Sequence, residues 1–219
     1  MFPIGDDNSQ RRVTPVVTFV LIAINVAVFL LELQRGDGFI TEWAFIPARF
    51  TENASVDWVT LFSAMFMHGG WLHLGGNMLY LWIFGDNVED RFGHVRFLLF
   101  YLAAGLAATF AQYAVNTGSA IPNVGASGAI AGVLGAYLLM FPKARVDVLL
   151  GRQVVGMPAF VVLGLWVVLQ LVSGVGSIAD TAQTEQGGVA YMAHVGGFAA
   201  GLVLGVLLGG LRRPPDRVA

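Results

Sequence analysis

Six apolar stretches limit what this chain can fold into, because each needs lipid or protein around it along its whole length. Two of them, residues 71–85 and 127–141, are short and begin with or near polar residues, as helices do that start in a water-filled cavity. The other four are long enough to cross a bilayer as helices: 15–33, 97–113, 154–172 and 190–208. With 56% hydrophobic and only 12% charged residues, the chain is too apolar for a soluble domain. We expect an all-α polytopic membrane protein with six transmembrane helices in a compact bundle.

The basic residues predict the orientation of this bundle. If both termini are cytoplasmic, Arg35 and Arg49 fall outside, and the other ten fall in inner segments: Arg11, Arg12, Arg91, Arg96, Lys143, Arg145, Arg152, Arg212, Arg213 and Arg217. The positive-inside rule strongly favours this arrangement. We therefore expect a multi-pass protein of the cell (plasma or inner) membrane with both termini cytoplasmic.

The chain divides into three parts on these grounds. Residues 1–12 form a short cytoplasmic segment without the pattern of a cleavable signal peptide, residues 13–211 form the membrane domain, and residues 212–219 form a short cytoplasmic tail. The net charge of -2 gives no reason to expect a nucleic-acid partner, and without cysteine neither a disulfide nor a thiolate metal site is possible.

Ser127 carries the one aliphatic hydroxyl in a run of mostly small, apolar residues that continues to Phe141. It lies where a loop becomes a helix, so backbone N–H groups without an intrahelical acceptor surround it. A nucleophile beside an anion site fits this pattern. So does a plain helix N-cap with a packing face of glycine and alanine behind it, and the pattern alone favours that simpler interpretation.

Three more polar residues share the depth of Ser127 in the membrane. In the predicted orientation the second, fourth and sixth helices all run inward, and His73, Ser127 and His194 each lie near the start of one of them. Asn77 follows His73 by one turn on the same helical face. Small residues at spacings of four, Gly128 and Gly132 in one helix and Gly197, Gly201 and Gly205 in another, allow two of these helices to approach closely. Each polar residue alone could serve only to hold helices together, but a shared depth for all four favours one site.

The chemistry of these residue types indicates acyl transfer. Ser127 would be the nucleophile and His194 its general base and later its acid. Apart from Glu32 at the outer edge of the first span, no acidic residue lies in the outer half of a helix, so we expect a dyad and not a triad. The Ser127 N–H, the His73 ring and the Asn77 amide would then hold the oxyanion.

Four motifs, taken in order, resemble those of the rhomboid family of intramembrane serine proteases in its bacterial six-helix form. They are HGGWLHLGGN at 68–77, GDNVEDRFG at 85–93, GASG at 125–128 and AHVGGFAAG at 193–201. The resemblance implies cleavage of single-pass membrane proteins at or near the outer leaflet, without metal or cofactor. It places Ser127 and His194 at the catalytic dyad, and His73 and Asn77 at the oxyanion donors.

The sequence departs from the family pattern at two places. Some relatives carry a Trp-Arg pair in the first outer loop, whereas Val59 follows Trp58 here. Some also place an aromatic residue one turn after the serine, to stack on the histidine, and this position is Ala131. Other contacts must then position the ring of His194.

Three alternatives compete with a protease. A catalytically inactive relative would bind membrane helices without cutting them. A channel or transporter could use His73, Asn77 and His194 as a relay, although no acidic residue lies inside a span. A zinc site would need His68, His73 and His194 from two helices and a loop. Outside the site, Glu89 is expected to be a capping or tethering carboxylate, His68 a loop or interface residue and His94 a surface residue.

Overall fold

The computed structural model describes residues 2–9, 11–179 and 189–211, and of residues 176–179 only the backbone. The predicted tail at 212–219 lies outside the described residues. The long helices are α1 (Val16–Arg35), α6 (Trp71–Phe92), α7 (His94–Val115), α8 (Ser127–Met140), α9 (Ala159–Ala179) and α11 (Tyr191–Leu207). Short helices follow α1: α2 (Asp37–Trp43), α3 (Pro47–Glu52), α4 (Ala54–Asp57), α5 (Thr60–Ser63) and the 3-10 turn η1 (Ala64–Phe66).

Each of the six predicted stretches overlaps one of the long helices, so the mostly helical prediction is confirmed. The stretch predicted at 71–85 is too short, since α6 continues to Phe92. Two of these helices, α1 and α7, are both long and apolar enough to cross a membrane. The helices α8 and α11 are apolar but shorter, as is Ala159–Val175, the part of α9 whose side chains the structure describes. The helix α6 has 22 residues but carries acidic and basic side chains in its second half.

A small antiparallel sheet corrects the all-α prediction. Its strands β1 (Phe2–Asp6), β2 (Arg145–Leu150) and β3 (Gln153–Pro158) pair in the order β1-β2-β3. The predicted span 154–172 is thus wrong at both ends, since residues 154–158 are strand and α9 continues to Ala179. Alternation of buried Val146 and Val148 with Arg145 and Asp147 favours a strand, and Gly151 at φ 61° closes the hairpin to β3.

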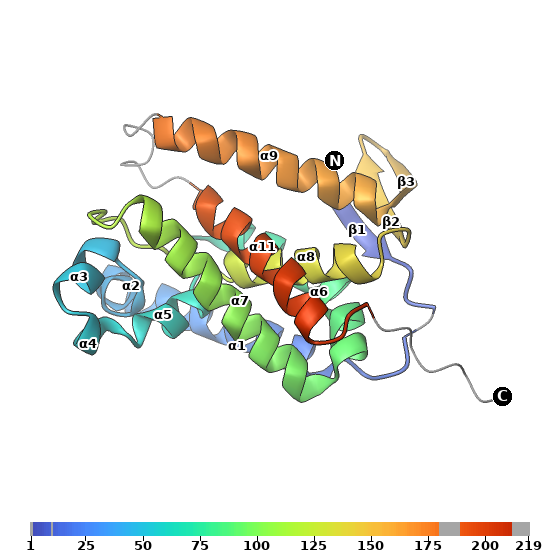
Figure 1. The fold of residues 1–219 in the computed structure, drawn as a ribbon. Helices are drawn as coiled ribbons and strands as arrows, with labels where there is room; N and C mark the ends of the chain where they lie inside the picture. Colours follow the sequence, from blue (N-terminus) through green and yellow to red (C-terminus); the bar gives the residue numbers. More distant parts are fainter. Residues whose placement is uncertain (1, 10, 180–188, 212–219) are drawn as a thin grey trace.

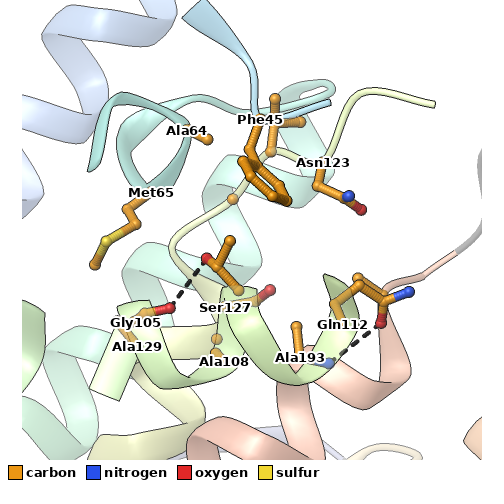
Figure 2. A pocket seen from close by; sticks show the side chains of 15 residues that line it. Phe45, Ala64, Met65, Gly105, Ala108, Gln112, Asn123, Ser127, Ala129 and Ala193 are labelled. Atoms are coloured by element: carbon orange, nitrogen blue, oxygen red, sulfur yellow. Dashed lines mark hydrogen bonds between the residues drawn. The ribbon is translucent and has the colours of Figure 1, made fainter. Parts of the chain in front are cut away.

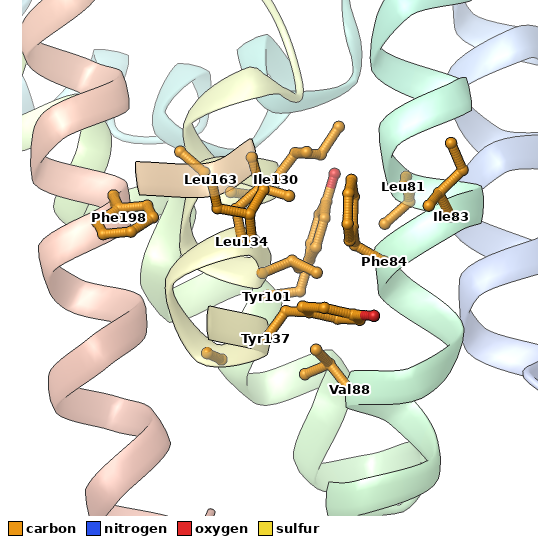
Figure 3. Packing of buried hydrophobic residues seen from close by; sticks show 14 of the residues in the cluster. Leu81, Ile83, Phe84, Val88, Tyr101, Ile130, Leu134, Tyr137, Leu163 and Phe198 are labelled. Atoms are coloured by element: carbon orange, nitrogen blue, oxygen red, sulfur yellow. The ribbon is translucent and has the colours of Figure 1, made fainter. Parts of the chain in front are cut away.

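The helix α8 lies inside the bundle, between α7, α11 and α6, with the short helices at one end of the molecule and the sheet at the other (Figure 1). All ten residues from Gly128 to Tyr137 are buried, because the helix is apolar on every side. The rings of Phe84 and Tyr137 meet edge to face at 5.0 Å, beside Leu134 and Tyr101 (Figure 3). The site at the start of α8 is therefore carried by the best-packed helix of the fold.

The predicted close approach of the glycine faces is confirmed. A Cβ added to Gly197 would overlap the carbonyl oxygen of Gly128, and one added to Gly201 would overlap that of Gly132. On its other side Gly132 faces Ala104 of α7. Small residues thus bring α8 into backbone contact with α11, which sets the distance between their first turns.

Glu89 is confirmed as a tethering carboxylate. It is fully buried and accepts hydrogen bonds from the backbone N–H groups of Val17 and Thr18 at 2.8 and 2.7 Å, and from the Thr18 hydroxyl at 2.7 Å. His94 Nδ1 lies 2.6 Å from Glu89 Oε1, the oxygen that also accepts the Val17 N–H, so this histidine is only partly a surface residue. Glu89 therefore caps the first turn of α1 from a neighbouring helix, where a negative charge is stabilised by the helix dipole.

Candidate active site

Ser127 is the first residue of α8 and not its N-cap. The N-cap is Ala126, and no side chain caps this helix start. The simpler interpretation of Ser127 as a capping residue is therefore wrong. Its hydroxyl is instead turned toward α11.

The structure brings Ser127 and His194 into contact. Ser127 Oγ and His194 Nε2 lie 2.8 Å apart, within ordinary hydrogen-bond distance. His194 is the fourth residue of α11, so both groups belong to the first turns of two helices that are locked by the glycine contacts. The sequence predicted this pair, and the geometry is that of a hydroxyl beside a base.

His73 lies on the other side of Ser127. Its Nδ1 accepts the N–H of Gly69 at 3.3 Å, so in the neutral ring the proton is on Nε2. Nε2 faces Gly125, where an added Cβ would lie 2.9 Å from that nitrogen and 3.6 Å from Ser127 Oγ. Glycine is required at position 125 for this reason, and because its φ of 134° is strained for other residues. His73 thus presents an N–H donor next to the serine.

Asn77 lies one turn further along α6 and is 8% exposed. Its Nδ2 is buried and has no hydrogen-bond partner within the part of the chain that the structure describes. Buried amide groups are nearly always paired in folded proteins, and leaving one unpaired is costly. This donor lines the cavity that Ser127 also lines, so it is available to a molecule bound there.

A single cavity connects the four predicted residues. It has a volume of about 680 Å³ and is lined by Ser127, His194, His73 and Asn77. Its remaining lining includes Trp166, Tyr80, Ile130, Ala131 and Leu134, so an apolar chamber surrounds a few polar groups. This combination is typical of a binding site for a mostly apolar substrate.

Two contacts to His194 were not predicted from the sequence. Gln170 Oε1 lies 2.7 Å from His194 Nδ1, and the Trp166 ring is 5.9 Å from the imidazole at 37°. These contacts position the ring where Ala131 has no aromatic group to offer. A signal was present, because Gln170 is the one polar side chain in the stretch 154–172 and stands one helical turn after Trp166.

A second, smaller cavity of about 50 Å³ lies on the α7 side of Ser127 (Figure 2). Gln112 of α7 stands at its edge and accepts the N–H of Ala193 at 3.3 Å. Ala193 is in the first turn of α11, whose N–H groups have no intrahelical acceptor. Gln112 therefore secures the start of the helix that carries His194.

His68 lies in the loop before α6, as predicted, but is 2% exposed. Burial, with a smaller contribution from His73, lowers the pKa of His68 to about 4, so its ring is neutral at pH 7. It packs edge to face against the His73 ring at 5.1 Å. Among the described residues no three histidine, cysteine or acidic side chains lie close enough together to hold a metal ion, so the zinc alternative lacks a ligand set there.

The fold and the site together define a helical bundle with a serine–histidine pair in contact at an internal cavity. The Rhomboid domain model matches residues 55–211 of the chain. The chain belongs to the rhomboid family, whose members are integral membrane proteins and include intramembrane serine proteases.

Named relatives come from bacteria, mitochondria and chloroplasts. Rhomboid protease GluP of Bacillus subtilis is 38% identical over 127 residues, which are 57% of this chain and 24% of that protein. Rhomboid protein 1, mitochondrial, of Saccharomyces cerevisiae is 30% identical over 194 residues, covering 86% of this chain and 52% of its own length. Rhomboid-like protein 11, chloroplastic, of Arabidopsis thaliana is 29% identical over 207 residues. The chain thus spans about a quarter of the first protein and about half of the second.

Proposed function

We propose that this chain is an intramembrane serine endopeptidase that cleaves transmembrane segments of single-pass membrane proteins near the outer face of the membrane. The observation that carries the proposal is the 2.8 Å contact between Ser127 Oγ and His194 Nε2 at the wall of an apolar cavity. Membership of a family that includes such proteases supports it.

The reaction follows from the positions of the two side chains. Ser127 Oγ attacks the scissile carbonyl carbon while His194 Nε2 takes the hydroxyl proton. The same nitrogen then donates this proton to the leaving amine, which departs with the C-terminal part of the substrate. A water molecule, deprotonated by His194, attacks the acyl-enzyme and restores the serine.

The oxyanion of the tetrahedral intermediate would be held by three donors. They are the backbone N–H of Ser127, the Nε2–H of His73 and the Nδ2–H of Asn77. Two observations support this role: Gly69 fixes the His73 proton on the nitrogen near Ser127, and Asn77 Nδ2 is unpaired among the described residues. Each donor of this kind typically contributes about 100-fold or more to the rate.

We further propose that α1, α6, α7, α8, α9 and α11 all cross the bilayer, with both termini cytoplasmic. The first turns of α6, α8 and α11 meet at one cavity, so these three helices enter from the same side. Arg49, one of two basic residues left outside, is paired with Asp57 at 2.7 Å and so is partly neutralised. The site would then open toward the outer face of the cell membrane, where water can enter.

The inactive helix-binding relative is the alternative to test against. Labelling of the detergent-solubilised protein with a fluorophosphonate probe, which needs no known substrate, separates the two. The wild type should be labelled, and Ser127→Ala and His194→Ala should each lower the labelling rate by at least about 1,000-fold. Both variants should melt within a few degrees of the wild type, and a chelator should leave labelling unchanged. A folded wild type that resists two different serine-reactive probes would indicate the inactive relative.

A further inference from the structure

Gln170 makes a contact to the proposed base that the acyl-transfer steps above do not use. It lies on α9, far in sequence from the motifs that carry Ser127 and His194, and its Oε1 is 2.7 Å from His194 Nδ1. We propose that Gln170 is a positioning residue, which keeps the proton of His194 on Nδ1 and so leaves Nε2 free to act as base. This inference rests on the proposed function, which it deepens.

The argument begins with the chemistry of the side chains. A glutamine Oε1 only accepts hydrogen bonds, so the 2.7 Å contact requires a proton on Nδ1. A neutral imidazole carries one proton, and Nε2 therefore has a lone pair. That lone pair is what the Ser127 hydroxyl, 2.8 Å away, needs in order to lose its proton. The opposite tautomer would place an N–H against the serine and abolish general-base catalysis.

Little else around the ring selects this tautomer. The Trp166 ring packs beside the imidazole at 5.9 Å and gives it van der Waals contact but no acceptor for Nδ1–H. Ala131 supplies no polar atom to the cavity wall through its side chain. No acidic side chain is hydrogen-bonded to His194 among the described residues. The amide oxygen of Gln170 thus occupies the place that a carboxylate takes in a triad.

Trp166 and Gln170 are four residues apart on α9, so they face His194 from one side of the helix. Trp166 fixes the plane of the imidazole, while Gln170 fixes the rotation of the imidazole and holds its proton on Nδ1. When the ring becomes imidazolium during the reaction, Nδ1–H keeps the same acceptor, so the base needs no rearrangement to return the proton. A neutral acceptor serves this purpose without placing a second charge inside the bundle.

The test reads the tautomer directly. The full-length protein would be labelled with 15N-histidine in detergent micelles, and the His194 signals assigned by their loss in His194→Ala. The wild type should show a protonated Nδ1 and an unprotonated Nε2. Gln170→Met keeps the length of the side chain and removes the acceptor, and it should shift the ring toward the other tautomer. Gln170→Glu keeps an acceptor oxygen and should preserve the wild-type tautomer.

A fluorophosphonate assay adds the consequence for reactivity. In Gln170→Met the rate constant of inactivation should fall roughly 10- to 100-fold, a part of the roughly 100- to 10,000-fold that a positioned base contributes. The apparent affinity for the probe should stay within twofold, because the cavity is unchanged, and Gln170→Glu should recover most of the rate.

Gln112→Leu is the matched control. This substitution in α7 also removes a side-chain amide oxygen, the one that accepts the Ala193 N–H at the start of α11. It does not touch the His194 imidazole. It should lower the melting temperature and leave the His194 tautomer as it is. A tautomer shift in Gln112→Leu as large as that in Gln170→Met would overturn the proposal, since any loosening of α11 would then suffice.

The remaining outcomes are equally decisive. A wild-type His194 that carries its proton on Nε2 overturns the role of Gln170, whatever the activity. An unchanged tautomer and rate in folded Gln170→Met does the same. A wild type with the expected tautomer but no labelling would support Gln170 and count against the proposed protease, so the two failures are distinguishable.

Discussion

Two of the polar clusters that the structure describes differ in how completely their groups are paired. Around Glu89, which we call the Glu89 anchor, the carboxylate is 0% exposed and contacts Val17, Thr18 and His94. In the cavity site, formed by Ser127, His194, His73 and Asn77, polar groups line a chamber of about 680 Å³ and the Asn77 amide nitrogen has no partner among the described residues.

The difference separates structural from functional polar groups. A buried polar group that is fully paired stabilises the fold and gains nothing from a ligand. One that faces a cavity with free hydrogen-bonding capacity costs stability until something binds to it. Substitutions should therefore lower stability at the Glu89 anchor and lower activity at the cavity site.

Among substitutions at these two clusters, the largest effect on stability is expected from Glu89→Ala. It leaves the first N–H groups of α1 and the Thr18 hydroxyl buried without an acceptor. We expect a loss of about 3 kcal/mol in the free energy of unfolding, which thermal melting in detergent would measure. Glu89→Gln, which keeps one acceptor oxygen, should lose less. Per folded molecule, the fluorophosphonate labelling rate should stay close to wild type. A specific loss of labelling would show that the Glu89 anchor also serves the cavity site.

Asn77→Ala should show the reverse. Loss of one oxyanion donor is expected to lower the rate of cleavage or labelling about 100-fold. The free energy of unfolding should change by less than about 1 kcal/mol, because the removed Nδ2 makes no hydrogen bond among the described residues. A melting temperature that falls as far as that of Glu89→Ala would show that Asn77 is a structural group.

The glycine contacts between α8 and α11 should affect both stability and activity. In Gly201→Ala the new methyl group meets the backbone of Gly132, so α8 and α11 must move apart. We expect a loss of about 2 kcal/mol in stability from this overpacking, with a lower labelling rate because Ser127 and His194 separate. Gly164→Ala in α9 is the control, since nothing lies within 4 Å of its added Cβ. Equal behaviour of the two variants would argue against close packing at Gly201.

The sequence predicted the residues of the cavity site better than the ends of the elements. Ser127, His194 and His73 could be found because each is polar in an apolar run and stands near a helix start. The spacings of four between glycines predicted that α8 and α11 approach closely. Their roles in catalysis remain predictions that the variants above test.

Two features were missed. Gln170 is the one polar side chain in the stretch 154–172, but its helix carries no motif, and only tertiary packing shows that α9 brings it to His194. The strands β2 and β3 were hidden by hydropathy, since Val154 and Val155 extend the apolar run into α9 although they pair with β2. A hydropathy window cannot tell an edge strand from the first turn of a helix.

Asp6, which ties β1 to the bundle, gives a pH-dependent effect. Its Oδ2 accepts hydrogen bonds from the Tyr137 hydroxyl and from Asn87 Nδ2, both at 2.7 Å. Burial raises the pKa of Asp6 to about 7, with smaller contributions from Asp86 and Asp7, while the Tyr137 hydrogen bond and, more weakly, Arg11 act in the opposite direction.

The sign of the resulting pH dependence follows from linkage. Between about pH 4 and 7 the folded protein holds a proton on Asp6 that the unfolded chain has lost, so this contribution to stability falls as pH rises through that range. Because the pKa rises from 3.8 to about 7, we expect a difference of up to about 4 kcal/mol between the two ends, seen as a melting temperature that declines toward pH 7 and a slope that Asp6→Asn removes. Asp7→Asn should leave the slope unchanged, because hydrogen bonds from Ser9 hold the pKa of Asp7 below its ordinary value and outside this range. A slope that survives in Asp6→Asn would assign the titration to another group, and Asp86, which lies beside Asp6, would be the next to replace.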